Sequence, residues 1–118
     1  MYARVISSQA DPQRIADSEE LEQLGEALAA SAVTQPGIRG FYGLVDRSTG
    51  RVMTVTLWET PQDLEASESS GYLRCQLANA QAVIGGGPVT RETFEVVAHG
   101  DPLEDAAALV HGVFERRR

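Results

Sequence analysis

At the start of the chain Tyr2, Arg4 and Ile6 alternate with Ala3, Val5 and Ser7, and this period of two predicts a strand over residues 2–7. Further on, apolar side chains recur at spacings of three and four: Leu21, Leu24, Leu28 and Ala32. That spacing places them on one face of a helix, which we predict over residues 18–33, with Asp17 and Glu20 as its capping box.

Two strands joined by a tight loop follow. Residues 38–46 and 51–59 are rich in aromatic and β-branched side chains, and residues 46–50 between them carry Asp, Ser, Thr and Gly. Such a loop joins neighbouring antiparallel strands. The segment 51–59, RVMTVTLWE, is the clearest strand of the chain.

A second helix is predicted from the residues that open it. Thr60 supplies a hydroxyl cap, Pro61 suits the first helical position, and the Asp63 carboxylate lies near the positive end of the helix dipole. Serine and glycine at 69–71 interrupt the pattern, which resumes over 72–84. We therefore expect a kinked helix or two consecutive helices.

The end of the chain predicts a fourth strand over residues 90–99 and a third helix over 101–116. The order strand, helix, strand, strand, helix, strand is typical of a ferredoxin-like α+β fold with an antiparallel sheet. We accordingly divide the chain into a ferredoxin-like domain, residues 1–99, and an appended helix within residues 100–118.

Neither face of this sheet is polar. On the third strand Met53 and Val55 share one face, while Val52 and Trp58 share the other. The predicted helices cover one face, so a second copy of the chain would have to cover the other, and we predict a homodimer. The alternative is that the appended helix folds back over the open face.

Composition narrows the chemistry. The 118 residues include 17 acidic and 10 basic ones, all of them arginine, for a net charge of −7, so nucleic acid and membranes are poor partners. Without lysine there is no Schiff-base or P-loop chemistry. One cysteine and two histidines exclude an internal disulfide and a three-histidine zinc site. We expect a cytoplasmic protein with no metal.

Three segments resemble the antibiotic-biosynthesis-monooxygenase-like family of dimeric α/β barrels: PGIRGFYG at 36–43, DRSTG at 46–50 and VMTVTLWET at 52–60. The likeness covers about residues 1–99. It implies homodimers whose sheets face one another and a cavity between sheet and helices in each subunit. Some members of the family oxidise aromatic polyketides without metal or flavin, others degrade haem, and many have no established activity.

The resemblance excludes the haem-degrading branch, which carries a tryptophan and a histidine on the second helix. Ala66 and Ser67 lie where that tryptophan would be, and there is no histidine between Thr60 and Gly87. We therefore expect no cofactor. The expected function is binding of a small apolar or aromatic molecule, with cofactor-independent oxygenation as the reaction of an enzyme. The alternatives are a non-catalytic ligand-binding or stress-related dimer and a structural dimerisation module.

Four residues are candidates for catalysis. Arg4 would stabilise negative charge on a substrate, Trp58 would wall an aromatic pocket, and His99 or Glu95 would move a proton. Each has a structural alternative. Arg4 on the first strand and Glu95 on the neighbouring fourth strand would form an ion pair, Trp58 would pack in the core, and His99 would be exposed.

Three more residues are candidates for substrate binding: Tyr42, Tyr72 and Thr56. The tyrosine hydroxyls would donate hydrogen bonds to a ligand, or would simply lie at the surface. Cys75 is predicted to be a buried small apolar side chain on the second helix.

Overall fold

The computed structural model describes residues 1–100. The helix predicted over 101–116, and its packing on the sheet, lie outside the described residues. Four antiparallel strands form one sheet in the order β2-β3-β1-β4. Their bounds are β1 Tyr2–Gln9, β2 Ile38–Asp46, β3 Arg51–Trp58 and β4 Val89–Glu95. This arrangement confirms the predicted antiparallel sheet.

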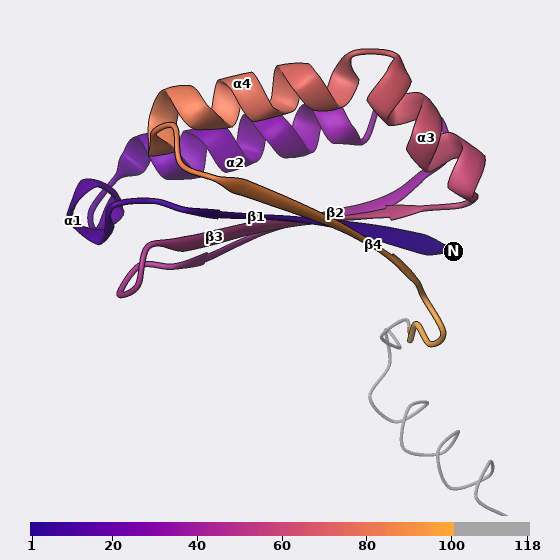
Figure 1. Ribbon diagram of the computed structural model, residues 1–118, viewed down its shortest axis with the longest axis horizontal. Helices are drawn as coiled ribbons and strands as arrows, with labels where there is room; N and C mark the ends of the chain where they lie inside the picture. The colour runs from indigo at the N-terminus through magenta and orange to yellow at the C-terminus, as the bar shows by residue number, and fades with distance from the viewer. Residues whose placement is uncertain (101–118) are drawn as a thin grey trace, which may run out of the picture.

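Four helices accompany the sheet: α1 Pro12–Ile15, α2 Glu19–Ala32, α3 Pro61–Ser69 and α4 Tyr72–Ile84. Figure 1 shows α2, α3 and α4 on one side of the sheet and the short α1 at its end. The fold is therefore α+β and ferredoxin-like, as the pattern of the sequence predicts. The opposite side of the sheet is bare of described helices.

The helix starts follow local side-chain chemistry. The hydroxyl of Ser18 accepts a hydrogen bond from the Leu21 amide at 3.1 Å, so Ser18 caps α2 and the predicted capping role of Asp17 is wrong. The unpredicted α1 begins where the Asp11 carboxylate accepts from the amide of Gln13 at 2.9 Å. Both caps satisfy amides that a first helical turn leaves without partners.

The predicted interruption of the second helix is a break into two helices. Gly71 has a φ of 89°, a left-handed conformation that most side chains disfavour, and α4 starts directly after it. The fourth strand ends at Glu95 instead of residue 99, because its partner β1 begins at Tyr2, which pairs with Glu95. One further backbone hydrogen bond, from the Val96 amide to the Met1 carbonyl at 2.9 Å, follows this last pair.

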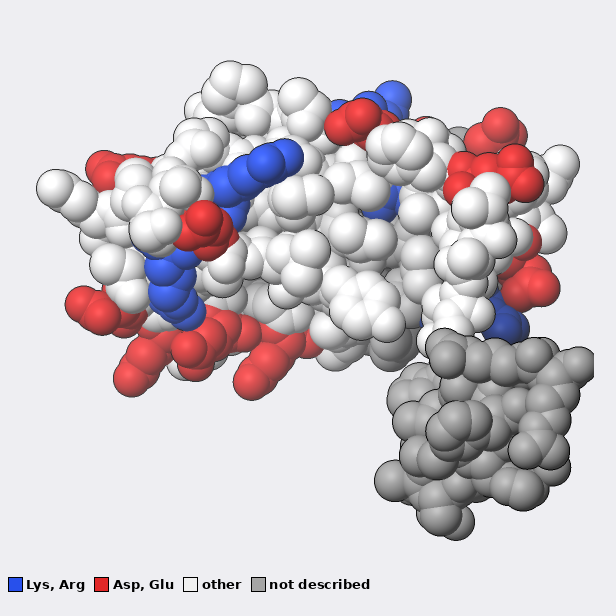
Figure 2. Space-filling model, turned by 90° about the horizontal axis from the view of Figure 1, so that it is seen from below, with Lys and Arg blue, Asp and Glu red and all other residues white. Residues whose placement is uncertain are grey.

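The strand register assigns side chains to the two faces. Arg4 pairs with Thr56 and lies on the helix side, together with Ile6 and Trp58. The open side carries a second set of mostly apolar residues: Val5, Tyr42, Leu44, Met53, Val55 and Phe94. Tyr42 is 55% exposed and Phe94 48% exposed. In Figure 2 uncharged side chains fill the middle of this face, and acidic groups gather at its margins.

Glycine is required where the β2–β3 hairpin meets the end of β1. Gly50 has a φ of 81°, and its carbonyl accepts from the Ala10 amide at 2.8 Å. A Cβ atom there would overlap the Ala10 carbonyl oxygen. Gly50→Ala should therefore lower the free energy of unfolding by at least about 2 kcal/mol in urea denaturation.

Gly25 provides the matched control. It lies inside α2, and a Cβ atom there would have no atom within 4 Å. Gly25→Ala should raise the free energy of unfolding by up to about 1 kcal/mol, because alanine has the higher helix propensity. Equal changes in the free energy of unfolding for Gly50→Ala and Gly25→Ala would contradict the claim that position 50 requires glycine.

Candidate ligand-binding site

A cavity of about 70 Å³ lies between the sheet and helices α2 and α4. Most of its lining is apolar: Ile6, Leu24, Leu28, Phe41, Leu73 and Ile84. Since a water molecule occupies about 30 Å³ of liquid, the cavity has room for only a few waters. Pockets for drug-sized ligands are several times larger. An aromatic ligand could bind only if side chains around the cavity moved.

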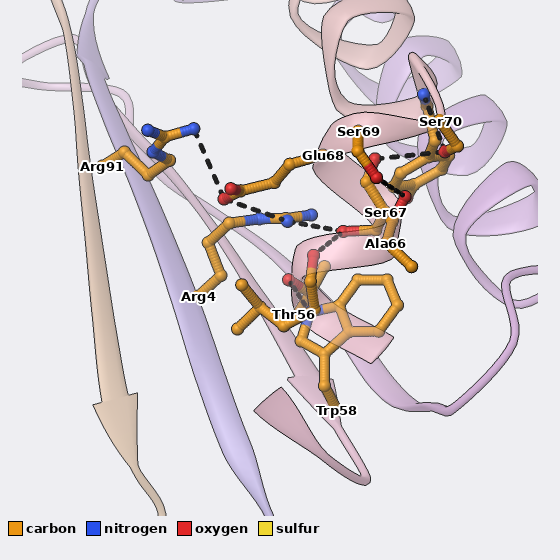
Figure 3. A network of polar contacts seen from close by, with 11 residues as sticks. Arg4, Thr56, Trp58, Ala66, Ser67, Glu68, Ser69, Ser70 and Arg91 are labelled. Atoms are coloured by element: carbon orange, nitrogen blue, oxygen red, sulfur yellow. Dashed lines mark hydrogen bonds and ion pairs between the residues drawn. The ribbon is translucent and has the colours of Figure 1, made fainter. Parts of the chain in front are cut away.

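Arg4 is the charged residue in this lining. Its side chain is 1% exposed, although it stands in the middle of β1. Figure 3 shows it reaching from the strand towards α3, where Nη1 donates to the Ser67 hydroxyl at 2.6 Å. The Ser67 hydroxyl in turn donates to the Leu64 carbonyl at 2.6 Å. A buried guanidinium is thus held by a helix packed on the sheet.

The charge partner of Arg4 is Glu68, and the predicted pair with Glu95 is wrong. Nη1 lies 3.6 Å from Glu68 Oε1, which is also 3.3 Å from Nη1 of Arg91 on β4. The register pairs Arg4 with Thr93, while Glu95 pairs with Tyr2 near the end of the sheet. The adjacency of β1 and β4 was predicted correctly. However, the Arg4 side chain extends into the helical layer, and the carboxylate that pairs with it belongs to Glu68 on α3.

Trp58 organises the groups around Arg4. The Arg4 Cζ lies 5.2 Å from the centre of the indole ring, within cation–π range. Tyr72 meets the same ring edge-on, with centroids 6.5 Å apart. The indole Nε1 donates to Thr56 Oγ1 at 2.9 Å. Trp58 is completely buried and does not line the cavity. It therefore acts on the cavity indirectly, by packing against Arg4 and Tyr72, which do line it.

One polar atom in this cluster lacks a partner. Among the described residues, the Arg4 Nε is the buried side-chain nitrogen or oxygen that makes no hydrogen bond. Burial lowers the pKa of the Arg4 guanidinium, and the nearby Glu68 carboxylate opposes this shift. An arginine keeps its charge under such conditions, so the unpaired N–H is a strong donor beside an apolar cavity.

Two hydroxyls in the lining are also available as donors. The Tyr72 hydroxyl oxygen accepts from Gln76 Nε2 at 3.0 Å, and Thr56 Oγ1 accepts from Trp58. Each hydroxyl therefore still has its own proton to offer. Burial raises the pKa of Tyr72, which keeps the phenol protonated at neutral pH. Arg4, Thr56 and Tyr72 all line the cavity, and together they present donors to its contents.

The remaining candidates lie elsewhere. Tyr42 pairs with Val55 and points to the open side of the sheet, so it does not share the cavity with Tyr72. Glu95 and His99 are exposed, at the end of β4 and beyond it. Cys75 is exposed, so its predicted burial is wrong. Helix α4 buries Leu73, and a residue two positions later in a helix points away from that buried face.

Sequence reasoning missed Ser67 and Glu68. The signal for Ser67 was its position three residues after Leu64, since both lie on the buried face of α3. No comparable signal marked Glu68. Within residues 1–100, no group of three or more His, Cys, Asp or Glu side chains is arranged to hold a metal ion. No helix of that part is long and apolar enough to span a membrane.

Comparison with known proteins identifies the fold. No protein-family model matches the chain, and no curated protein matches it in sequence. Solved structures do match. A protein provisionally assigned as an antibiotic biosynthesis monooxygenase, from Deinococcus radiodurans, has a TM-score of 0.66 at 13% identity, covering 87% of this chain and 99% of its own.

Two further structures agree. A protein of unknown function from Nitrosomonas europaea has a TM-score of 0.65 at 17% identity, covering 86% of this chain and 94% of its own. SnoaB from Streptomyces nogalater, a cofactor-independent oxygenase, has a TM-score of 0.59 at 16% identity, covering 83% and 94%. The resemblance predicted from the sequence is thus confirmed at the level of the fold, which is that of antibiotic-biosynthesis-monooxygenase-type structures.

The buried phenol of Tyr72 predicts how stability depends on pH. The folded state keeps this proton to a higher pH than the unfolded state, in which tyrosine titrates near 10.0. Above that pH the unfolded state binds fewer protons, so the free energy of unfolding should fall as the pH rises through the folded-state pKa. Of the three tyrosines, Tyr72 should ionise in a late phase of an ultraviolet absorbance titration.

Two tyrosine variants check this assignment. Tyr72→Phe should remove the late phase and flatten the alkaline loss of stability. Tyr2→Phe, at a tyrosine that lies outside the cavity lining and not on the open side of the sheet, should leave both unchanged. A late phase that persists in Tyr72→Phe would contradict the assignment.

Proposed function

We propose that this protein is a homodimeric α/β barrel that binds a small, mostly apolar or aromatic molecule between its sheet and helices. The observation that carries this proposal is the unpaired Nε–H of Arg4 beside the cavity. A buried charged donor without an acceptor is costly, typically by about 1–3 kcal/mol or more. A ligand oxygen that accepts this hydrogen would remove that cost. The ligand should therefore combine an apolar ring with a carbonyl, enolate or phenolate oxygen.

As an enzyme, the protein would catalyse cofactor-independent monooxygenation. Oxidation of a ring CH₂ group by O₂ gives a carbonyl and water, so one oxygen atom enters the product and the other leaves with the two hydrogens. Arg4, Thr56 and Tyr72 would stabilise the negative charge that develops when the substrate loses its first proton. The fold shared with SnoaB, a cofactor-independent oxygenase, supports this reaction class. We assign His99 and Glu95 no role inside the cavity of their own subunit.

A non-catalytic ligand-binding dimer is the second candidate. The observation that favours it is the small cavity volume of about 70 Å³, which does not hold a polyketide ring system. In either case we expect the protein to act in the cytoplasm, where an exposed thiol such as Cys75 stays reduced.

The dimer is proposed from the open side of the sheet. The described part of the chain leaves apolar side chains of this face exposed, including Tyr42, Leu44 and Phe94. Large exposed apolar patches mark interaction sites, and a two-fold pairing of like surfaces closes on itself. A stable interface of this kind should bury at least about 1,000 Å² in total.

Ligand binding can be tested with anthrone, a tricyclic ketone that offers both features. Anthrone should raise the melting temperature of the wild-type protein. Arg4→Met should abolish that rise while the variant stays folded, because methionine fills the same space without a donor. Arg39→Met is the matched control, since Arg39 is exposed and pairs with Glu59 at 3.2 Å. An unchanged response of Arg4→Met would contradict the role of Arg4.

The same compound separates enzyme from binding protein. Oxygen consumption with anthrone, measured by electrode, should be lost in Arg4→Met and kept in Arg39→Met if the protein is an oxygenase. A melting shift without oxygen consumption would favour the non-catalytic dimer.

The association state can be tested by light scattering. The wild-type chain should give twice the 12.7 kDa mass of one chain. Tyr42→Asp should give a folded monomer, because it places a charge in the proposed interface where the single chain leaves the side chain exposed. Val33→Asp, at an exposed valine after α2, should remain dimeric. A monomeric wild-type protein would refute the dimer.

A further inference from the structure

A second hollow lies directly outside the cavity. It is a groove of about 540 Å³ between α2 and the start of α4. Ser31, Gln35, Cys75 and Asn79 contribute to its walls. The groove is therefore much larger than the cavity, and unlike the cavity it is large enough for several rings.

Groove and cavity share a wall. Four residues line both: Leu24, Leu28, Tyr72 and Gln76. In this wall Gln76 Nε2 donates to the Leu28 carbonyl at 3.1 Å and to the Tyr72 hydroxyl at 3.0 Å. The Gln76 amide thus links α4 to α2 across the boundary between the two spaces.

This link can be broken at low cost. Leu28 lies inside α2, where its carbonyl already accepts the helical hydrogen bond of the residue four positions later, so releasing Gln76 leaves no bare acceptor. The hydrogen bond between Gln76 and the Tyr72 hydroxyl is only partly buried. In contrast, α4 itself is anchored by the buried side chains of Leu73 and Ile84. The movable part of the wall is therefore the Gln76 side chain and not the helix.

We propose that Gln76 is the gate of the ligand site and that the groove is its access route and outer half. This inference rests on the proposed function and specifies the ligand further. The ligand is an elongated molecule whose oxygen-bearing ring passes Gln76 into the cavity while the rest stays in the groove. Opening the gate also frees the Tyr72 hydroxyl oxygen, so Tyr72 meets the ligand at the point of passage.

Another hollow adjoins the cavity on its β2 side, with a volume of about 210 Å³. The two spaces share five lining residues: Leu24, Leu28, Phe41, Val52 and Thr54. None of the three donors, Arg4, Thr56 and Tyr72, lines this hollow, and none of the five shared side chains makes a hydrogen bond among the described residues. The groove side is therefore the better supported route.

The gate can be tested without any ligand. In a Cys75→Ser background, Thr56→Cys places a single thiol in the cavity, where the side chain is 5% exposed. Its rate of reaction with methyl methanethiosulfonate reports how often the cavity opens. Adding Gln76→Ala should raise this rate about tenfold, the factor expected for one to two lost hydrogen bonds.

Asn79→Ala is the matched control, because Asn79 lines the groove but makes no bond across the wall. It should leave the rate unchanged. Should the Thr56→Cys protein fail to fold, as judged by circular dichroism, Ala80→Cys places the thiol in the same lining. If the cavity thiol reacts at the same rate with glutamine or alanine at position 76, Gln76 is not a gate and the proposal fails.

The groove as the outer half of the site is tested with the natural thiol. Anthrone should slow alkylation of Cys75 by N-ethylmaleimide several-fold, whereas phenol, a single ring, should not. If anthrone raises the melting temperature but leaves Cys75 fully reactive, the groove is not part of the site and the inference fails. If no melting shift occurs while Gln76→Ala still speeds the cavity thiol, the proposed function fails and the gate stands.

Discussion

The burial of one positive charge, that of Arg4, governs the helix side of this protein. A guanidinium in the middle of a strand must be compensated, and several elements contribute to that compensation. Trp58 at the end of β3 lies under the guanidinium, while Ser67 and Glu68 approach it from α3. The start of α3 at Thr60 and Pro61 sets the helix position and so brings these two residues over the strand. The polar end of the cavity is a product of this packing.

One N–H group of the buried guanidinium, at Arg4 Nε, has no hydrogen-bond acceptor, and this missing bond connects structure with function. A protein that needed Arg4 for stability alone would gain from an acceptor at Nε, and replacement of buried charges by apolar groups is often neutral or stabilising. The arrangement is better explained if a visiting molecule supplies the acceptor. The hydroxyls of Tyr72 and Thr56 point to the same conclusion, because each already accepts one hydrogen bond and retains a proton to give.

Much of the fold could be predicted because its determinants are local. The hairpin of β2 and β3, the Thr60 cap and the break at Gly71 follow from turn chemistry, capping and backbone preference. The end of β4 could not be predicted locally, since it depends on where β1 begins. For the site, the alternation of side chains along a strand predicts which residues share a face with Thr56. It does not predict which face the helices cover, and Tyr42 and Tyr72 were therefore both predicted to bind the substrate. The Arg4 partner was missed because Glu68 reaches it across layers and not along the sheet.

The Glu68 carboxylate also bears on how the sheet ends. It joins Arg91 of the edge strand β4 to the helical layer, and this strand carries Glu92 and Glu95 as well. Charged side chains along an edge discourage further strands from adding to it, which is how many soluble β-sheets avoid fibrous growth. Lateral extension of the sheet is therefore opposed on this side, and the broad apolar face is left as the surface on which chains can meet. One acidic residue thereby links the chemistry around Arg4 to protection against aggregation.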